Sequence, residues 1–285
     1  MAEPVSRRAA FRKLHESGCF LIPNPWDVGS ARYLRHLGFK ALATSSAGFS
    51  FAQGRPDGEG GVSREAALGH FAEIVSATEL PVNADYQSGY AASAEDLAES
   101  VRLCVGTGVA GLSIEDATGD SNRPLFEVSR AVERIAAARA AIDSSGADVL
   151  LTARAECYLV GSGEPLKESI RRLVAYADAG ADVLYAPGAR DREDIRAIVA
   201  AASPKPVNVL AVSGLRLSLS DLAELGVRRV SVGSGLARAA WTGLIRAATA
   251  MAKEGSFAGL DGLVPHSELD GFFREDAKSR SWSGV

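Results

Sequence analysis

One phrase recurs along the chain and limits the folds that it can adopt. In each copy an amphipathic, Ala- and Leu-rich stretch ends at a glycine, and a short apolar run follows that ends in small or polar residues. The copies lie at residues 37–46, 107–116, 145–156, 179–188 and 225–235. Glycine commonly ends a helix, and unbroken apolar runs are typical of buried parallel strands. Each copy therefore predicts the end of a helix followed by a parallel strand.

Three more apolar runs, at 19–24, 80–86 and 205–211, bring the predicted strands to eight. Between the strands, segments such as 93–106 and 168–180 have apolar residues at helical spacing. Eight such units in 285 residues, without a GxGxxG turn after the first strand, favour the α/β class and a (β/α)8 TIM barrel over an open doubly wound sheet.

We expect one domain covering residues 1–285. Residues 234–255 are predicted to form the eighth helix, and residues 256–285 a C-terminal helical tail. Apolar residues beyond a completed barrel usually need a partner, so this tail predicts a contact between subunits of a homo-oligomer.

Charge and cysteine usage narrow the classes of function. The chain has 31 basic and 35 acidic residues, a net charge of −4, and no polybasic run, which disfavours nucleic acid and membranes as partners. Its three cysteines are far apart, which argues against a disulfide framework and a structural zinc site. The N-terminus lacks a signal peptide's apolar core, and no run approaches the ~20 apolar residues of a membrane span. We expect a cytoplasmic protein that acts on a small molecule.

Barrel enzymes place their chemistry at the C-terminal ends of the strands, where this sequence concentrates polar residues. Acids gather at the predicted ends of strands three to five: Asp85, Glu115, Asp116 and Glu156. Carboxylates at such close quarters repel one another unless a cation lies among them, and an oxygen-only ligand set suits Mg2+. The alternative is structural: the acids pair with Arg154 and nearby lysines, or cap the helices that follow.

The same stretches resemble the isocitrate lyase/phosphoenolpyruvate mutase superfamily over most of the barrel, from "LIPNPWDVGSARYL" (21–34) to "VSVGSGLARAA" (230–240). The motifs that carry the resemblance are "NAD" (83–85) before a Gly-aromatic pair, "GLSIED" (111–116) and "LTARAE" (151–156). The resemblance implies a Mg2+-binding (β/α)8 barrel, assembled as a dimer or dimer of dimers (a homotetramer) with the eighth helix swapped between subunits. It also implies making or breaking a C–C or C–P bond beside a 2-oxo or 2-hydroxy acid, through an enolpyruvate-like intermediate.

The resemblance also assigns metal-site residues. It makes Asp85 and Glu115 the metal carboxylates and Asp57, in "GRPDGE", a further acid near the metal. Asn83 stands where the family has its first Asp. An amide accepts hydrogen bonds but carries no charge, so Mg2+, or Mn2+ as the alternative, is expected to be held differently or more weakly.

Substrate-binding residues follow from the same resemblance. Ser45, Ser46 and Ala47 are expected to hold the substrate carboxylate through main-chain amides and a hydroxyl. Arg154 is expected to clamp a carboxylate or phosphonyl group, and Asn208 to line the pocket. As an alternative, Arg154 is only the counterion of its neighbouring acids.

Two departures narrow the branch of the family. Segment 116–128 has neither the Cys nor the His of the isocitrate lyase loop. Its residues Asp120 to Arg123 resemble the gating loop of the phosphonomutase-like branch, which makes Asn122 a candidate partner of the leaving group. The His that phosphoenolpyruvate mutases place after strand six is also missing from 184–191.

The prediction is therefore a Mg2+-dependent lyase or phosphonomutase-like enzyme, with decarboxylation and hydrolysis also open. Two other functions compete with it. "VSVGSG" (230–235) resembles the phosphate loop of barrels that act on sugar phosphates. A catalytically inactive ligand-binding barrel would account for Asn83 and the missing base.

Overall fold

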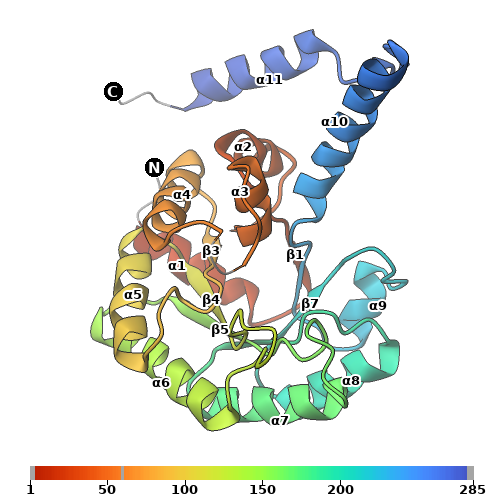
Figure 1. The fold of residues 1–285 in the computed structure, drawn as a ribbon. Helices are drawn as coiled ribbons and strands as arrows, with labels where there is room; N and C mark the ends of the chain where they lie inside the picture. Colours follow the sequence, from red (N-terminus) through yellow and green to blue (C-terminus); the bar gives the residue numbers. More distant parts are fainter. Residues whose placement is uncertain (1–3, 59–60, 281–285) are drawn as a thin grey trace. The chain divides into compact units, whose positions relative to one another are not determined.

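The computed structural model describes residues 4–58 and 61–280. In these residues eight strands form one parallel sheet in the order β1-β8-β7-β6-β5-β4-β3-β2. The main-chain N–H of Ala43 donates to the Pro23 carbonyl (3.0 Å), which links the β2 and β1 edges. This nearly closed sheet, with helices around it (Figure 1), confirms the predicted (β/α)8 barrel. The strands are β1 Phe20–Ile22, β2 Leu42–Ala43, β3 Val82–Asp85, β4 Gly111–Glu115, β5 Leu150–Arg154, β6 Val183–Tyr185, β7 Val207–Leu210 and β8 Arg229–Ser231.

Helices alternate with these strands, and the recurring phrase explains how they end. Its five glycines all adopt a positive φ, the backbone conformation that most side chains avoid: Gly38, Gly108, Gly146, Gly180 and Gly226. The helices of this part of the chain are α1 Pro4–Leu14, α2 Val28–His36, α3 Ser46–Ala52, α4 Arg64–Ala77, α5 Ala94–Gly106, α6 Val128–Ser144, α7 Pro165–Asp178, α8 Arg192–Ala202 and α9 Leu219–Glu224.

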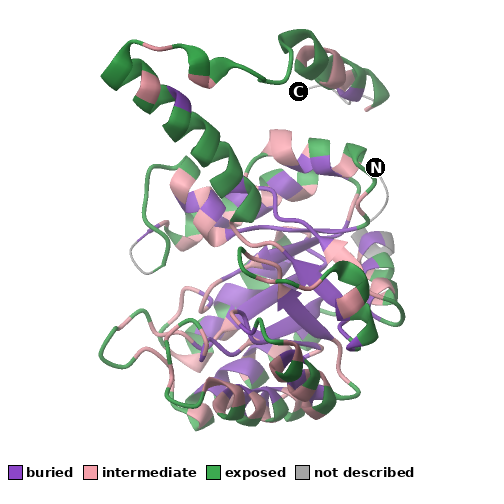
Figure 2. Cartoon of the chain, turned by 90° about the vertical axis from the view of Figure 1, so that its right-hand side faces the viewer, coloured by how far each residue is buried: buried purple, intermediate pink, exposed green. Residues whose placement is uncertain are grey.

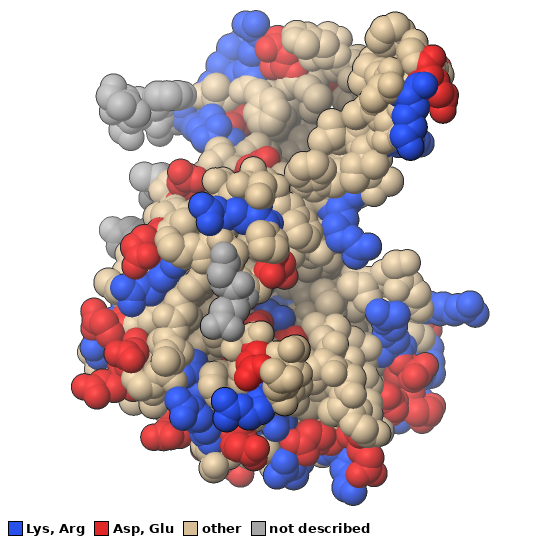
Figure 3. Space-filling view, in the orientation of Figure 1, with Lys and Arg blue, Asp and Glu red and all other residues tan. Residues whose placement is uncertain are grey.

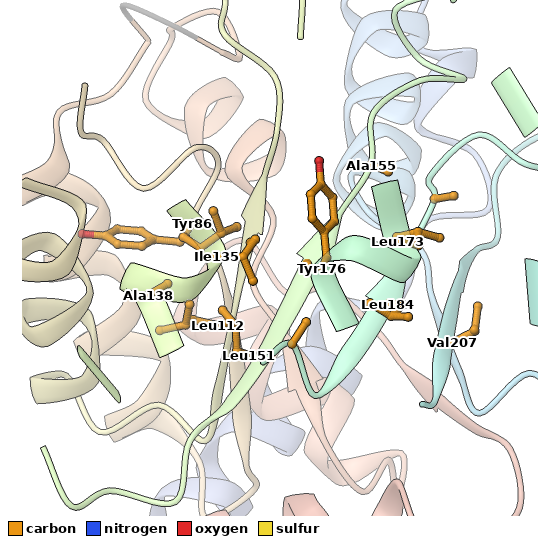
Figure 4. Packing of buried hydrophobic residues seen from close by; sticks show 14 of the residues in the cluster. Tyr86, Leu112, Ile135, Ala138, Leu151, Ala155, Leu173, Tyr176, Leu184 and Val207 are labelled. Carbon is orange, nitrogen blue, oxygen red and sulfur yellow. The ribbon is translucent and has the colours of Figure 1, made fainter. Parts of the chain in front are cut away.

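The main core lies between the strands and the helices that cover them. The strands are almost wholly buried, whereas the helices keep exposed outer faces (Figure 2). Figure 4 shows the packing of strand residues such as Leu112 and Leu151 with Ile135 of α6 and Tyr176 of α7. Each fully buried Leu or Ile contributes about 2 kcal/mol of stability. This layer holds the strand ends in fixed positions.

A smaller apolar cluster lies at the opposite end of the barrel from the strands' C-terminal ends. Phe11 of α1 is fully buried and packs with Ile22, Ala43 and Leu150. A Cβ on Gly111, the first residue of β4, would lie 2.7 Å from the Phe11 ring. Helix α1 therefore closes the N-terminal end of the barrel, which we call the floor.

The chain packs as two compact units, Met1–Leu236 and Ala237–Val285. The second unit contains most of α10 (Gly235–Glu254), together with the 3-10 helix η1 (Ala258–Leu260) and α11 (His266–Ser279). Helices thus occur where the eighth helix and the tail were predicted. Helix swapping and the homo-oligomer stay predictions, as does the single domain.

Charged side chains of both signs lie on the surface. Lys and Arg side chains alternate with Asp and Glu over the face seen in Figure 3. Of the helices within residues 4–58 and 61–280, none is long and apolar enough to cross a membrane.

Candidate active site

A cavity of about 200 Å³ opens among the C-terminal ends of the strands and continues into the barrel. It brings together seven of the predicted site residues: Ser45, Ser46, Ala47, Asp57, Asp85, Arg154 and Asn208. Asn83 also lines it. Asn122 is outside this lining: it is exposed on the segment between β4 and α6, and its main-chain N–H donates to Asp120 Oδ1 (2.8 Å).

Arg154, the last residue of β5, is the hub of the site. Its guanidinium pairs with three carboxylates: Asp85 at 2.5 Å, Glu115 at 3.1 Å and Glu156 at 2.9 Å. It also lies 5.4 Å from the centre of the Tyr185 ring. Burial lowers the Arg154 pKa, but the three acids raise it more, so this residue stays charged. Three of the four acids predicted to gather, Asp85, Glu115 and Glu156, thus lie around Arg154.

Asp85, the last residue of β3, is fixed by the neighbouring strand and helix. Its main-chain N–H donates to Thr44 Oγ1 (2.9 Å), and its Oδ2 accepts the N–H of Ser46 at the start of α3 (2.9 Å). Gln87 Nε2 donates to Asp57 Oδ1 (3.3 Å). Partial burial and the charge of Asp85 raise the pKa of Asp57. The ionisation of Asp57 is therefore disfavoured by the charge of Asp85.

Glu115, the last residue of β4, is largely buried and, like Asn122, lies outside the cavity lining; it is connected to the site through its ion pair with Arg154. Burial raises the pKa of Glu115 to about 8, Arg154 opposes this rise, and the charges of Glu156 and Asp85 add to it. The pKa of Glu156 is also raised, again mainly by burial. One guanidinium therefore does not neutralise all the acids around it, and the site has room for more positive charge.

Asp116 follows Glu115 in the chain but faces the opposite way. Its carboxylate accepts hydrogen bonds from Tyr176 (2.6 Å), from Arg172 (3.0 Å) and from the main-chain N–H of Glu156 (2.9 Å). Both partner side chains come from α7, behind the strands. The salt-bridge alternative therefore describes Asp116: it ties α7 to the ends of β4 and β5.

The residues present fit a hard divalent ion that keeps most of its waters. Among the described residues no group of three His, Cys, Asp or Glu side chains is arranged to hold an ion. Asp85 and Glu115 are nonetheless brought to one guanidinium, and the acids are in excess. Asn83 Oδ1 is buried and has no hydrogen-bond partner in the described part of the chain, so an acceptor for a water is at hand. One or two carboxylates with several waters is the usual Mg2+ environment.

The loops around the cavity are tied together by Asn24. Its Oδ1 accepts the main-chain N–H groups of Val232 and Gly233, each at 2.9 Å, and its Nδ2 donates to the Thr44 carbonyl (2.9 Å). One amide thus joins the loops after β1, β2 and β8. Asp27, three residues later, caps α2 by accepting the N–H of Ser30 (2.7 Å).

The residues predicted to bind the substrate already form hydrogen bonds within the protein. Ser45 Oγ accepts the N–H of Gly48 (3.1 Å) and caps α3. Asn208 Nδ2 donates to Ser231 Oγ (3.0 Å). Their positions on the cavity wall agree with the expected roles, which stay predictions.

Two further cavity residues, Tyr185 and Arg229, were missed by the sequence analysis as site residues. Tyr185 ends β6, whereas Arg229 begins β8. A charged residue at the start of the apolar run "RVSVG" (229–233) was the available signal. Arg229 lies at the N-terminal end of its strand, whereas barrel sites are expected at the C-terminal ends.

Comparison with known proteins adds independent information. Residues 11–252 match the family described as Phosphoenolpyruvate phosphomutase. An uncharacterised protein of Mycobacterium tuberculosis is 34% identical over 261 residues, which cover 91% of this chain and 94% of that protein. An oxaloacetate decarboxylase of Paraburkholderia xenovorans is 30% identical over 243 residues, 81% of this chain and 76% of the enzyme.

Two solved structures resemble the whole fold. A candidate lyase/mutase from Burkholderia cenocepacia J2315 superposes with a TM-score of 0.91 at 47% identity, over 95% of this chain and 97% of that chain. An oxaloacetate acetylhydrolase in complex with its product oxalate has a TM-score of 0.84 at 26% identity, over 97% of each chain. These similarities extend along nearly the entire sequence.

Proposed function

Because the chain belongs to the phosphoenolpyruvate phosphomutase family of the isocitrate lyase/PEP mutase superfamily, we propose that it is a Mg2+-dependent lyase or mutase-type enzyme. Its substrate is a 2-oxo or 2-hydroxy carboxylate, and the bond that it makes or breaks is the adjacent C–C or C–P bond. The observation that carries this proposal is the arrangement around Arg154, whose guanidinium pairs with both Asp85 and Glu115 beside the cavity, with acids in excess.

Asp85 and Glu115 would hold the ion, with Asp57 close by and Mn2+ as an alternative metal. A divalent ion at this place supplies Lewis-acid stabilisation for the negative charge of an enolate-like transition state, worth several kcal/mol. The raised pKa of Glu115 supports the proposal, because an added cation favours the ionised carboxylate that metal binding requires.

The chain's own residues would then position the substrate. Arg154 keeps Glu156 as a partner when Asp85 and Glu115 serve the metal, so its other N–H groups are available to the substrate carboxylate. Ala47 lies on the same wall of the cavity, next to Ser46, whose main-chain N–H donates to Asp85. Catalysis by positioning and fixed charge of this kind needs no covalent intermediate.

A sugar-phosphate barrel is a weaker second candidate. That function needs free main-chain N–H groups in the segment 230–235. Two of them, on Val232 and Gly233, already donate to Asn24 Oδ1. The loop that suggested phosphate binding is therefore used inside the protein.

Calorimetric titration of oxalate, a mimic of the pyruvate enolate, tests the proposal with Mg2+ present and again with the metal chelated. We expect binding only with Mg2+, loss of binding in Asp85→Ala, and unchanged binding in the control Asp27→Ala, which removes a surface helix cap of the same chemistry. Binding that survives chelation or Asp85→Ala contradicts the metal site. Binding without turnover of any 2-oxo acid, 2-hydroxy acid or phosphonopyruvate would favour the inactive ligand-binding barrel.

A further inference from the structure

One row of side chains leads from the mouth of the cavity to its floor. The parallel register pairs Arg154 with Tyr185, Tyr185 with Asn208, and Asn208 with Arg229. Residues paired in this way share a face of the sheet, and all four line the cavity. Arg154 ends its strand, whereas Arg229 begins its own. Because barrel strands tilt by about 35–45°, the row descends into the barrel, and Arg229 lies deep in the cavity.

Arg229 is held there by neutral groups. Its Nε donates to Asn208 Oδ1 (2.8 Å), its Nη2 donates to Thr152 Oγ1 (3.1 Å), and its Nη1 lies 3.4 Å from His15 Nε2. The other ring nitrogen of His15 bonds to the carbonyl of Phe11 (2.8 Å), so it carries the proton and leaves Nε2 as an acceptor.

No carboxylate balances this cation. Within residues 4–58 and 61–280, Arg229 forms no ion pair, although it is only 3% exposed. Burial lowers its pKa to about 10, which leaves it charged at neutral pH. The carboxylates of the cavity wall, Asp57 and Asp85, lie at the mouth, on the loop before α4 and at the end of β3. Buried charges in proteins are normally paired, and this one faces a cavity instead.

We propose that Arg229 is a carboxylate-binding subsite at the floor of the cavity, separate from the groups at the mouth. Three of its five N–H groups are used by Asn208, Thr152 and His15, which fix the guanidinium plane and leave donors for a guest. A volume of about 200 Å³ holds roughly six waters, enough for a small organic acid. The two arginines stand at different depths of one cavity, so a substrate carboxylate at each would align the molecule along the barrel.

The carboxylate at the floor has two sources, a second acid group of the substrate or a separate small anion. A matched pair of ligands tests the first source: 2-oxoglutarate and 2-oxopentanoate have the same chain length and differ only in the second carboxylate. The four-carbon pair of oxaloacetate and 2-oxobutyrate tests a shorter span. Sodium formate against sodium chloride at equal ionic strength tests the second source by the thermal midpoint. The first arm rests on the proposed function, and the formate arm is independent of it.

With Mg2+ present, we expect the wild-type protein to bind at least one diacid about tenfold more tightly than its matched monoacid, the usual size of a charge-assisted hydrogen bond. The variant Arg229→Met should lose that preference, and Arg229→Lys should keep part of it, because it retains the charge without the fork. Oxalate is expected to bind only at the mouth of the cavity. Its affinity for each Arg229 variant therefore shows whether the proposed metal site is still intact. A formate-specific rise in thermal midpoint that Arg229→Met abolishes would assign the subsite to a free anion.

Equal affinities within both ligand pairs for the wild type, together with no formate effect, overturn the subsite, and this result needs no variant to fold. A preference that survives in a folded Arg229→Met protein overturns it as well. Loss of all oxalate binding with the formate effect intact would reject the proposed function and keep the subsite. Intact Mg2+-dependent oxalate binding, together with ligand and formate effects that Arg229→Met leaves unchanged, would keep the proposed function and reject the subsite.

Discussion

Removing the charge of Glu115 or of its neighbour Asp116 should change the free energy of unfolding by very different amounts. Asp116 accepts hydrogen bonds from Tyr176, Arg172 and the Glu156 main chain, all in the protein interior. The substitution Asp116→Asn keeps the shape and removes the charge that Arg172 faces. Breaking one partner of a buried pair costs about 3–5 kcal/mol. Arg172 keeps Glu168 at 2.7 Å and the Phe126 carbonyl at 2.9 Å, so we expect the low end, about 3 kcal/mol.

Glu115→Gln is the matched control. When Glu115 becomes neutral, Arg154 keeps two carboxylate partners, Asp85 and Glu156, so its charge stays paired. We therefore expect a change in unfolding free energy below about 1 kcal/mol. Glu115→Gln should instead weaken Mg2+-dependent oxalate binding, because it removes a proposed metal carboxylate.

Urea unfolding at pH 7.5, followed by circular dichroism, measures both variants. A loss of about 3 kcal/mol corresponds to a fall in thermal midpoint of roughly 6–12 °C for a protein of about this size. The reasoning is refuted if Asp116→Asn costs less than about 1 kcal/mol, or if Glu115→Gln costs as much as Asp116→Asn. Either result would mean that the two side chains do not divide into a structural acid and a site acid.

Three further predictions concern acid, metal and core. Burial lowers the pKa of His15 to about 3 and that of His70 to about 4, so the unfolded chain binds more protons than the folded protein below about pH 6.5. The unfolding free energy should therefore fall by about 3 kcal/mol per histidine as the pH drops from about 6.5 toward 4. In urea unfolding, His70→Gln should make this dependence of the unfolding free energy on pH less steep. Asn83→Asp replaces an amide oxygen that has no partner by a charged carboxylate oxygen and should raise Mg2+ affinity in calorimetry about tenfold; unchanged or weaker affinity would contradict the expected place of residue 83 beside the metal. Phe11→Ala should cost about 3–5 kcal/mol in urea unfolding, since Phe11 is fully buried at the floor, whereas Leu37→Ala at a 57% exposed position should change stability by less than about 0.5 kcal/mol.

The barrel could be predicted because its signal is local and repeated. Each phrase places a glycine such as Gly108 or Gly180 where a helix must end, and an apolar strand follows at once. The family resemblance then identified Asp85 and Arg154, and reading the strand ends in order brought the acids to one place. The barrel and the grouping of the acids need only the periodicity of the chain and the rule that parallel strands end at the same face, whereas the roles expected of Asp85 and Arg154 come from the resemblance.

Partners from distant elements could not be predicted in this way. Asp116 pairs with residues of α7 that lie 56 and 60 positions later, and nothing in "GLSIED" indicates which way its side chain turns. The depth of Arg229 depends on register and tilt, which composition does not encode. The closure of the floor by Phe11 is likewise a tertiary contact of a helix whose own sequence looks ordinary.

The hydrogen bonds of Asn24 to the loop after β8 limit when the cavity can form during protein synthesis. Its contacts to Val232 and Gly233 span 208 and 209 positions of sequence, so they form only after nearly the whole barrel has been made. Contacts this distant are slow to form, because a long loop must close before they contribute. A nascent chain that ends before residue 233 therefore lacks both the last wall of the cavity and the amide partner that orders its rim. The ribosome must therefore release the final strand before the protein can bind a ligand in its barrel. Ligand binding measured on stalled nascent chains of increasing length would show at which chain length the cavity becomes complete.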